Sequence, residues 1–242
     1  MTKQEVLGTI EKAEERFDAV GSHSFFARNI LRAFWLRGKY IKYIFLRLFP
    51  FLRAVVVEIK GKTTWGRTFL VPAGDVYGIS LACFGLLTGP DICVAKYLTK
   101  KMKETDVFYD IGANYGFYGM LAQELAVRGE IHLFEPVPQL TAYLRKNFSV
   151  PRKNEKIFLN EVAISDTSGR SVFYESYSTA ASGNSTLRED VSREHEGAFR
   201  PVQVDNITLD EYVKTHSYPT IIKMDIEGAE GKALAGARDA LA

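Results

Sequence analysis

Cysteine is scarce in this sequence. Cys83 and Cys93 are the only two among 242 residues, and no CxxC spacing joins them. Two thiols cannot build a disulfide framework and cannot supply the four ligands of a structural zinc site. The first twenty residues also lack the apolar stretch of a secretory signal peptide. These absences predict a reduced chain that works in the cytoplasm.

Acidic residues are missing from one segment, between Ala19 and Val57. That segment carries seven Lys and Arg residues, so the other residues carry 31 − 7 = 24 basic against 29 acidic side chains. Basic character is therefore local, although the net charge of the whole chain is only +2. Long apolar runs are missing too, because a Lys or Arg recurs throughout residues 25–53 and excludes a membrane-spanning helix there.

We expect residues 1–57 to form a basic, aromatic helical arm. Within residues 25–53, Phe, Trp and Tyr are interleaved with Lys and Arg. This composition suits peripheral contact with the anionic inner face of a membrane. It equally fits an arm that packs its aromatic side chains on the body of the protein. Both interpretations stay open, and no nucleic-acid partner is expected.

The rest of the chain has an ordinary globular composition, with 46% hydrophobic and 25% charged residues. Residues 58–105 predict a hairpin that turns at Gly61 and Lys62, followed by a lead-in helix over 91–104. From residue 106 to 242, short apolar strands alternate with helical patterns. Strand and helix in alternation predict an α/β fold with a doubly wound, mostly parallel sheet. The predicted strands cover 106–112, 130–136, 156–165 and 220–228, and the predicted helices cover 116–127, 139–148 and 229–241.

The alternation breaks between the third and the last of these strands. Residues 168–176 predict a further strand, residues 178–186 form a loop of small residues, and residues 199–213 predict a strand that enters a short helix. Loops of this length in compact domains are often functional. No strand pattern follows the last helix, so we expect the domain to lack its C-terminal strands in this chain.

The strongest chemical signal is DIGANYG, residues 110–116, directly between a predicted strand and a helix. Glycines there let the backbone approach a ligand beside a helix N-terminus. A dinucleotide fingerprint would also need glycine at 114 and 117, where this chain has Asn114 and Phe117, so a diphosphate cofactor is disfavoured. Glu135 ends the next strand, where an acidic side chain commonly holds ribose hydroxyls. Together these residues predict an adenosine site without a phosphate grip.

A second cluster lies in KMDIEGAE, residues 223–230, at the carboxyl end of the last predicted strand. Asp225 and Glu227 face the expected ligand crevice, with Glu230 and Lys223 close by in the sequence. The carboxylates suit a general base or positioning group for an acceptor hydroxyl. They also suit oxygen ligands for a divalent cation, or acids that complement the dipole of the following helix. The sequence leaves these three roles open.

The motifs DIGANYG, FEPVP, NEVAISD, GNSTL, ITLDEY and IKMDIEGAE, in this order, resemble the FkbM family of S-adenosylmethionine-dependent methyltransferases. The resemblance covers about residues 106–237, roughly half of the chain. It implies a class I methyltransferase fold, which is Rossmann-like. It also implies S-adenosylmethionine as methyl donor, and O-methylation of a hydroxyl on a sugar, glycan or natural product.

The resemblance also assigns site residues. It implies cofactor contacts at the glycine turn, a ribose contact, and main-chain contacts beside the adenine. The GNSTL loop is small and polar, so it could line the acceptor pocket, or it could be a flexible loop exposed to solvent. The alternative is a non-catalytic, membrane-associated scaffold or binding fragment that keeps the fold. The cofactor residues that the resemblance implies are Asp110, Gly112, Asn114, Gly116, Glu135, Ala163 and Ile164. From the residues themselves, we expect Asn184 and Ser185 to contact the acceptor, and Asp225 and Glu227 to be the catalytic residues.

Overall fold

The structure is a computed structural model. It describes residues 1–21, 58–73, 75–87, 90–150, 154, 156–176 and 199–242. The predicted arm segment 25–53 and the predicted acceptor residues Asn184 and Ser185 lie outside this part of the chain. The chain divides into two compact units, residues 1–101 and 102–242. The domain boundaries predicted at 57 and 105 stay predictions.

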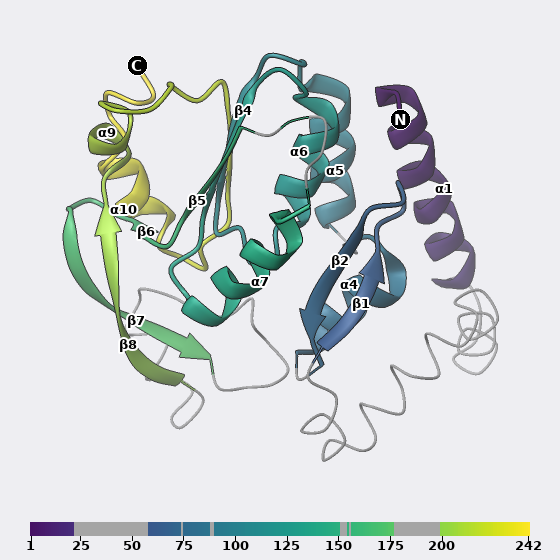
Figure 1. The fold of residues 1–242 in the computed structure, drawn as a ribbon, viewed down its shortest axis with the longest axis horizontal. Helices are drawn as coiled ribbons and strands as arrows, with labels where there is room; N and C mark the ends of the chain where they lie inside the picture. Colours follow the sequence, from purple (N-terminus) through teal and green to yellow (C-terminus); the bar gives the residue numbers. More distant parts are fainter. Residues whose placement is uncertain (22–57, 74, 88–89, 151–153, 155, 177–198) are drawn as a thin grey trace. The chain divides into compact units, whose positions relative to one another are not determined.

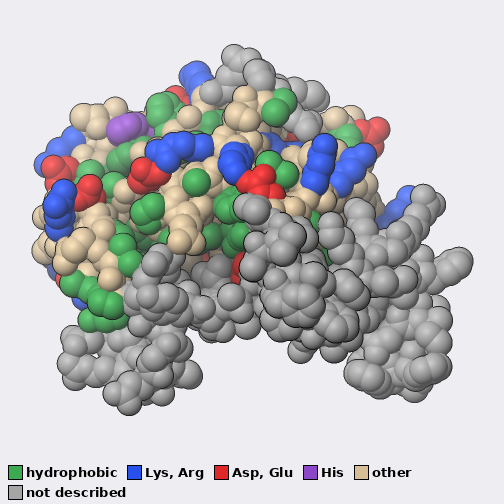
Figure 2. All heavy atoms as spheres, turned by 60° about the horizontal axis from the view of Figure 1, so that its bottom comes forward, with side chains coloured by type: hydrophobic (Ala, Val, Ile, Leu, Met, Phe, Trp, Pro, Cys, Tyr) green, Lys and Arg blue, Asp and Glu red, His purple; other side chains and the backbone are tan. Residues whose placement is uncertain are grey.

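In the part of the chain that the structure describes, no helix combines the length and the apolarity that a membrane crossing requires. The cytoplasmic location and the membrane contact both stay predictions. On the face drawn in Figure 2, acidic and basic side chains of the described residues are mixed, in line with the small net charge of +2.

The first unit contains an antiparallel hairpin between two helical parts. The predicted turn at Gly61 and Lys62 is wrong, because both residues lie in the first strand, paired with Phe69 and Thr68. A Cβ at position 61 would lie 2.4 Å from the Phe69 ring, so glycine is needed there for packing. The turn instead centres on Gly66, which has φ +90°. The elements of this unit are α1 (Lys3–Gly21), β1 (Glu58–Lys62), β2 (Thr68–Pro72), α4 (Val76–Phe84) and α5 (Pro90–Lys101).

The second unit is built on a parallel sheet, which confirms the predicted α/β class. Its strand order is β5-β4-β3-β9, and every neighbouring pair is parallel. The chain runs from β3 outward through β4 to β5 and then returns to the opposite side of β3. The strand order therefore reverses between β3 and β9, which is where open α/β sheets bind ligands. The four strands are β3 (Val107–Ile111), β4 (Glu130–Phe134), β5 (Ile157–Asn160) and β9 (Ile221–Met224).

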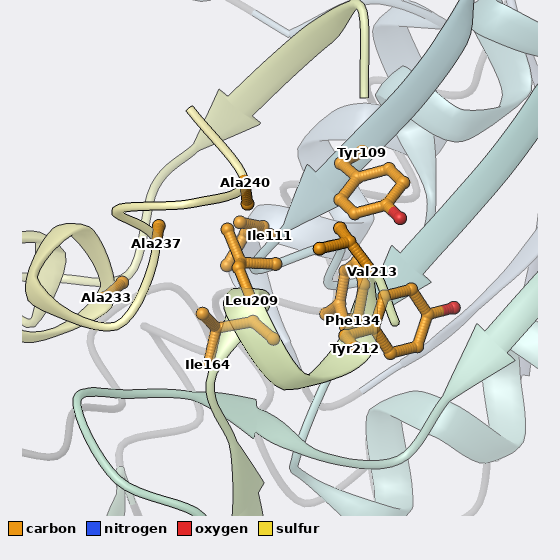
Figure 3. Close-up of a cluster of buried hydrophobic side chains, with 10 residues drawn as sticks. All are labelled: Tyr109, Ile111, Phe134, Ile164, Leu209, Tyr212, Val213, Ala233, Ala237 and Ala240. Atoms are coloured by element: carbon orange, nitrogen blue, oxygen red, sulfur yellow. The ribbon is translucent and has the colours of Figure 1, made fainter. Parts of the chain in front are cut away.

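Helices cover both faces of this sheet, as the doubly wound prediction requires (Figure 1). On one face, a Cβ at Gly119 in α6 would lie 2.6 Å from Leu133 in β4, so helix and strand pack closely. On the other face, Tyr109 and Ile111 of β3 join a buried cluster with residues of α9 and α10 (Figure 3). The helices are α6 (Phe117–Leu125), α7 (Pro138–Phe148), α9 (Leu209–Tyr212) and α10 (Glu230–Ala235).

The single strand predicted over 156–165 is wrong. Strand β5 of the parallel sheet ends at Asn160. The Asn160 side chain donates a hydrogen bond to the Leu133 carbonyl and accepts one from the Tyr212 hydroxyl. The chain then enters a separate three-stranded sheet of order β6-β8-β7. The strands predicted around 168–176 and 199–207 are confirmed as the antiparallel pair of this sheet. Its strands are β6 (Ala163–Ile164), β7 (Gly169–Ser176) and β8 (Phe199–Ile207).

The helix predicted over 229–241 is too long, because α10 ends at Ala235. The following turn is held by Asp210, whose carboxylate accepts the backbone N–H groups of residues 238, 239 and 240 at 2.8–3.1 Å. The Asp210 N–H also donates to the Gly236 carbonyl. Asp210 therefore anchors the last turn of the described chain to α9.

We expect Asp210→Ala to lower the free energy of unfolding by about 1–3 kcal/mol, since three N–H groups lose a charged acceptor. Urea unfolding followed by circular dichroism measures the change. Asp205→Ala is the matched control, because its ion pair with Arg170 is exposed and should contribute less than about 1 kcal/mol. Equal losses in the two variants would contradict the anchoring role.

Candidate functional site

Ionisable side chains meet at the carboxyl ends of three neighbouring strands. Asp110 lies in β3, directly beside Lys223 of β9 in the strand register. Glu135 follows the last residue of β4, and Asp225 follows the last residue of β9. The structure thus places Asp110, Glu135 and Asp225, all predicted from the sequence, at the edge of the sheet where the strand order reverses.

The predicted glycine turn connects β3 to α6. Gly112 and Gly116 have φ values of +78° and +85°, and Asn114 adopts +51°. The N–H groups of Gly112 and Ala113 both donate to the Phe134 carbonyl at 3.0 Å, which fixes the turn against β4. The strand-to-helix turn is therefore confirmed.

Protein atoms fill the space that a side chain at the two glycines would need. A Cβ at Gly112 would lie 2.1 Å from the backbone oxygen of Asp225, and one at Gly116 would lie 2.5 Å from the Phe148 ring. The glycine requirement is therefore explained by close packing of the turn against β9 and α7. The cofactor contacts implied for Gly112 and Gly116 stay predictions.

Asp110 is completely buried. Neither of its carboxylate oxygens makes a hydrogen bond of ordinary geometry with the described residues. Two donors nevertheless lie near enough to act on the carboxylate: the Lys223 ammonium, 3.3 Å from Oδ1, and the Gly119 backbone N–H. The pKa of Asp110 is raised, because burial and the negative charge of Asp225 outweigh the lowering effect of Lys223 and of the Gly119 N–H. A buried carboxylate of this kind is costly unless a donor satisfies it.

Glu135 joins the two turns that follow β3 and β4. Its side chain is buried, with Oε2 accepting the Asn114 N–H at 2.9 Å and Oε1 accepting the Val137 N–H at 3.0 Å. Burial raises the pKa of Glu135 to about 7 against the opposing effect of these two N–H groups. The side-chain oxygen of Asn114 is buried without a hydrogen-bond donor in the described part of the chain. Together with Asp110, the turn therefore presents acceptor oxygens that a donor-bearing ligand would satisfy.

The carboxylates after β9 are more open. Asp225 and Glu227 are both exposed, and Glu227 has a φ of +52°. The pKa of Glu227 is raised by partial burial and by the negative charges of Asp225 and Glu230. Glu230 accepts the Ile226 N–H at 3.0 Å at the start of α10, which fits the helix-start role. No group of three or more His, Cys, Asp or Glu side chains suited to a metal ion occurs within the described ranges.

The residues expected beside the adenine have a different environment. Ala163 and Ile164 form the short strand β6, outside the parallel sheet. The Ile164 side chain packs in the hydrophobic cluster with Phe134 and Leu209 (Figure 3). Both side chains of this strand are buried, its main chain pairs with β8, and the adenine contact stays a prediction.

Lys223 is a charged residue of the candidate site to which the sequence alone assigned no role. Its ammonium donates to the Gly112 carbonyl at 2.9 Å and lies over the Tyr118 ring, 5.2 Å from the centroid. The sequence feature that could have drawn attention to Lys223 is its position as a single charged residue inside the apolar run TIIKM. Its partner, however, depends on which strand pairs with β9.

Comparisons with known proteins found a matching family model, a similar sequence and similar structures. Residues 110–242, more than half of the chain, match the sequence model of the methyltransferase FkbM domain. The chain is 29% identical over 149 residues to the 2-O-methyltransferase NoeI of Sinorhizobium fredii (strain NBRC 101917 / NGR234), covering 57% of this chain and 60% of that protein. The chain thus spans about three fifths of the length of that relative.

Two solved structures are also similar. One is the methyltransferase FkbM from Methylobacillus flagellatus KT, with 17% identity and a TM-score of 0.41, covering 69% of this chain and 42% of that one. The other is TYW2 from P. horikoshii in complex with MeSAdo, with 10% identity and a TM-score of 0.34, covering 45% of this chain and 37% of that one. The match to the family model ends at the last residue of the chain and begins at Asp110.

Proposed function

Because the chain belongs to the methyltransferase FkbM family, we propose that it transfers a methyl group from S-adenosylmethionine to a hydroxyl oxygen of a sugar, glycan or natural product. One observation carries the proposal: buried acceptor oxygens of Asp110 and Asn114 lie at the strand-order reversal, beside the Glu135 carboxylate. The relative NoeI is described as a 2-O-methyltransferase, which supports oxygen as the atom that is methylated.

The chemistry of the site suits this donor. S-adenosylmethionine carries an ammonium group, ribose hydroxyls and a positively charged sulfonium, which together need acceptor oxygens and negative charge. Among the described residues, Lys223 supplies the positive charge that acts on the carboxylates of Asp110, Glu135 and Glu227, and Asp225 adds a further negative charge beside them. An excess of carboxylates favours a cationic ligand and opposes a diphosphate.

Each residue then has a role. When bound, the donor would supply a methyl carbon that is already activated by the sulfonium. Asp110 would accept from the ammonium group, and Glu135 from the ribose hydroxyls. Asp225 or Glu227 would hold the acceptor hydroxyl and take its proton as the oxygen attacks the methyl carbon, while the sulfur keeps the electron pair of the broken bond. The pKa of Glu227 is raised by burial and by neighbouring carboxylates, which is the direction that strengthens a carboxylate as a general base, and alignment supplies most of the rate.

Glu135→Gln tests the donor site. The amide nitrogen of Gln would meet one of the two backbone N–H groups that the carboxylate accepts, and the ribose would lose a charged acceptor. Hydrogen bonds to charged groups contribute about 1.5–3 kcal/mol, so we expect about 10- to 100-fold weaker binding of S-adenosylhomocysteine. Isothermal titration calorimetry measures the affinity.

Glu161→Gln is the matched control, since Glu161 is exposed and pairs with Arg145 at the surface. Equal affinity of the Glu135 and Glu161 variants would remove Glu135 from the donor site. A folded wild-type chain that binds no S-adenosylhomocysteine would favour the non-catalytic alternative.

Mass spectrometry of a cell extract incubated with labelled donor would identify the acceptor by the labelled methyl group that it gains.

A further inference from the structure

Lys223 is the cationic centre of the site. Its side chain is only 11% exposed, and its ammonium makes three contacts: the Gly112 carbonyl, the Asp110 carboxylate and the face of the Tyr118 ring. These partners belong to β3, to the turn after it and to α6. One side chain from β9 therefore links the strand, the turn and the helix that build the candidate donor site.

The ion pair between Lys223 and Asp110 lies among further negative charges. No Lys, Arg or His other than Lys223 forms an ion pair with Asp110 among the residues that the structure describes. The other charged groups that act on Asp110 and its neighbours are carboxylates, namely Asp225 after β9 and Glu135 after β4. A fully buried carboxylate next to further negative charge is ionised only if a positive charge stands close to it.

We propose that Lys223 is a positioning residue, whose ammonium keeps Asp110 ionised and fixes the Gly112 carbonyl, so that β9 sets both the charge and the shape of the glycine turn. The claim about Asp110 concerns the protein alone. Its consequence for the donor rests on the proposed function. An ionised Asp110 attracts the ammonium of a methyl donor, whereas a protonated Asp110 is neutral and offers one acceptor oxygen fewer.

Substitution of Lys223 should therefore act through the protonation of Asp110. In Lys223→Met, which keeps the length and the apolar stem, the titration midpoint of the Asp110 carboxyl should move upward by about one to three pH units. Lys223→Arg keeps the charge and should leave the midpoint within about half a pH unit of the wild type. The measurement is carbon-13 NMR of the aspartate carboxyls, with Asp110→Asn to assign the signal.

Calorimetry with S-adenosylhomocysteine from pH 6 to pH 9 tests the consequence. The ratio of wild-type to Lys223→Met affinity should be tenfold or more at pH 7 and should shrink as the pH rises, because Asp110 regains its charge. Relative to Asp110→Asn alone, the double variant Asp110→Asn, Lys223→Met should lack the part of the pH dependence that belongs to Asp110. Any dependence that remains belongs to Glu135, whose pKa of about 7 lies in the same range and is also lowered by Lys223. Lys232→Met, at an exposed lysine of α10, should leave the affinity unchanged.

The outcomes separate the two proposals. An Asp110 midpoint that stays in place or moves downward in Lys223→Met would overturn the positioning role. So would an affinity loss of the same size at every pH, which is what a purely structural role produces. If the midpoint moves upward but no variant and no wild-type chain binds the analogue, the proposed function fails, whereas the control of Asp110 by Lys223 stands.

Discussion

The Gly112→Ala variant should lose about 2–5 kcal/mol of its free energy of unfolding. Gly112 has a φ of +78°, a conformation that costs a residue with a Cβ about 1–2 kcal/mol. The new methyl group would also lie 2.1 Å from the backbone oxygen of Asp225. That oxygen cannot move away cheaply, because the Asp225 N–H is held by the Ile111 carbonyl at 3.1 Å, and overpacking of this kind adds about 1–3 kcal/mol. Urea unfolding followed by circular dichroism measures the loss.

Gly231→Ala is the matched control with the opposite expected sign. Gly231 lies inside α10, and none of the described atoms considered around it comes within 4 Å of an added Cβ. Alanine is the better helix former by about 0.8–1 kcal/mol, so this variant should be slightly more stable than the wild type. If both variants changed stability in the same direction and by the same amount, the close approach of β9 to the turn would be disproved.

The location of this turn could be predicted from the sequence, but the reason for its glycine could not. An apolar strand, DIGANYG and a helical pattern follow one another in the chain, so local information is enough to find the turn. The atom that forbids a side chain at Gly112 belongs to Asp225, more than a hundred positions later. Such a constraint appears only when the strand order is known, because β9 is separated from β3 in the chain by the whole insertion.

The need to know the strand order also explains which parts of the candidate site could be predicted from the sequence. Carboxylates at strand ends, such as Asp110, Glu135 and Asp225, could be placed from the sequence because parallel strands end at one edge of the sheet. The contact of Asp110 with Lys223 depends on the register between β3 and β9. A pattern of apolar residues predicts that a strand exists but contains no information about its register with a distant partner.

The positions of turns were predicted less accurately than the presence of strands and helices. In the first unit, Gly61 and Gly66 both signal a turn, and the structure uses Gly66 because the Phe69 ring occupies the space beside Gly61. In the second unit, the apolar run around Asn160 continues into β6, so its period does not reveal that the chain leaves one sheet for another. Side-chain hydrogen bonds of Asn160 to β4 and α9 mark the change.

A buried histidine, His132, should make the stability of the protein depend on pH. It lies beside Tyr109, on the face of the parallel sheet that packs against α9. His132 of β4 is fully buried and stacks on Phe158, with ring centroids 4.3 Å apart. Its Nδ1 lies 2.8 Å from the Tyr212 hydroxyl, and its Nε2 lies 3.4 Å from the Glu130 carboxylate. Burial outweighs the attraction of Glu130 and lowers the pKa of His132 to about 4, from an ordinary value of 6.5.

The native protein therefore holds His132 neutral, whereas the unfolded chain binds a proton below about pH 6.5. The stability from this residue is fully present above that pH and should fall by about 1.4 kcal/mol per pH unit towards pH 4, a total of about 3 kcal/mol. Urea unfolding between pH 7.5 and 4.5 measures it, and His132→Gln, which cannot titrate, should show a correspondingly smaller acid loss. Tyr212→Phe, which removes the hydrogen bonds of the hydroxyl to His132 and to Asn160, should lower stability at pH 7.5 by about 1–3 kcal/mol. If His132→Gln kept the full acid loss, other groups would cause it and His132 would not control the pH dependence.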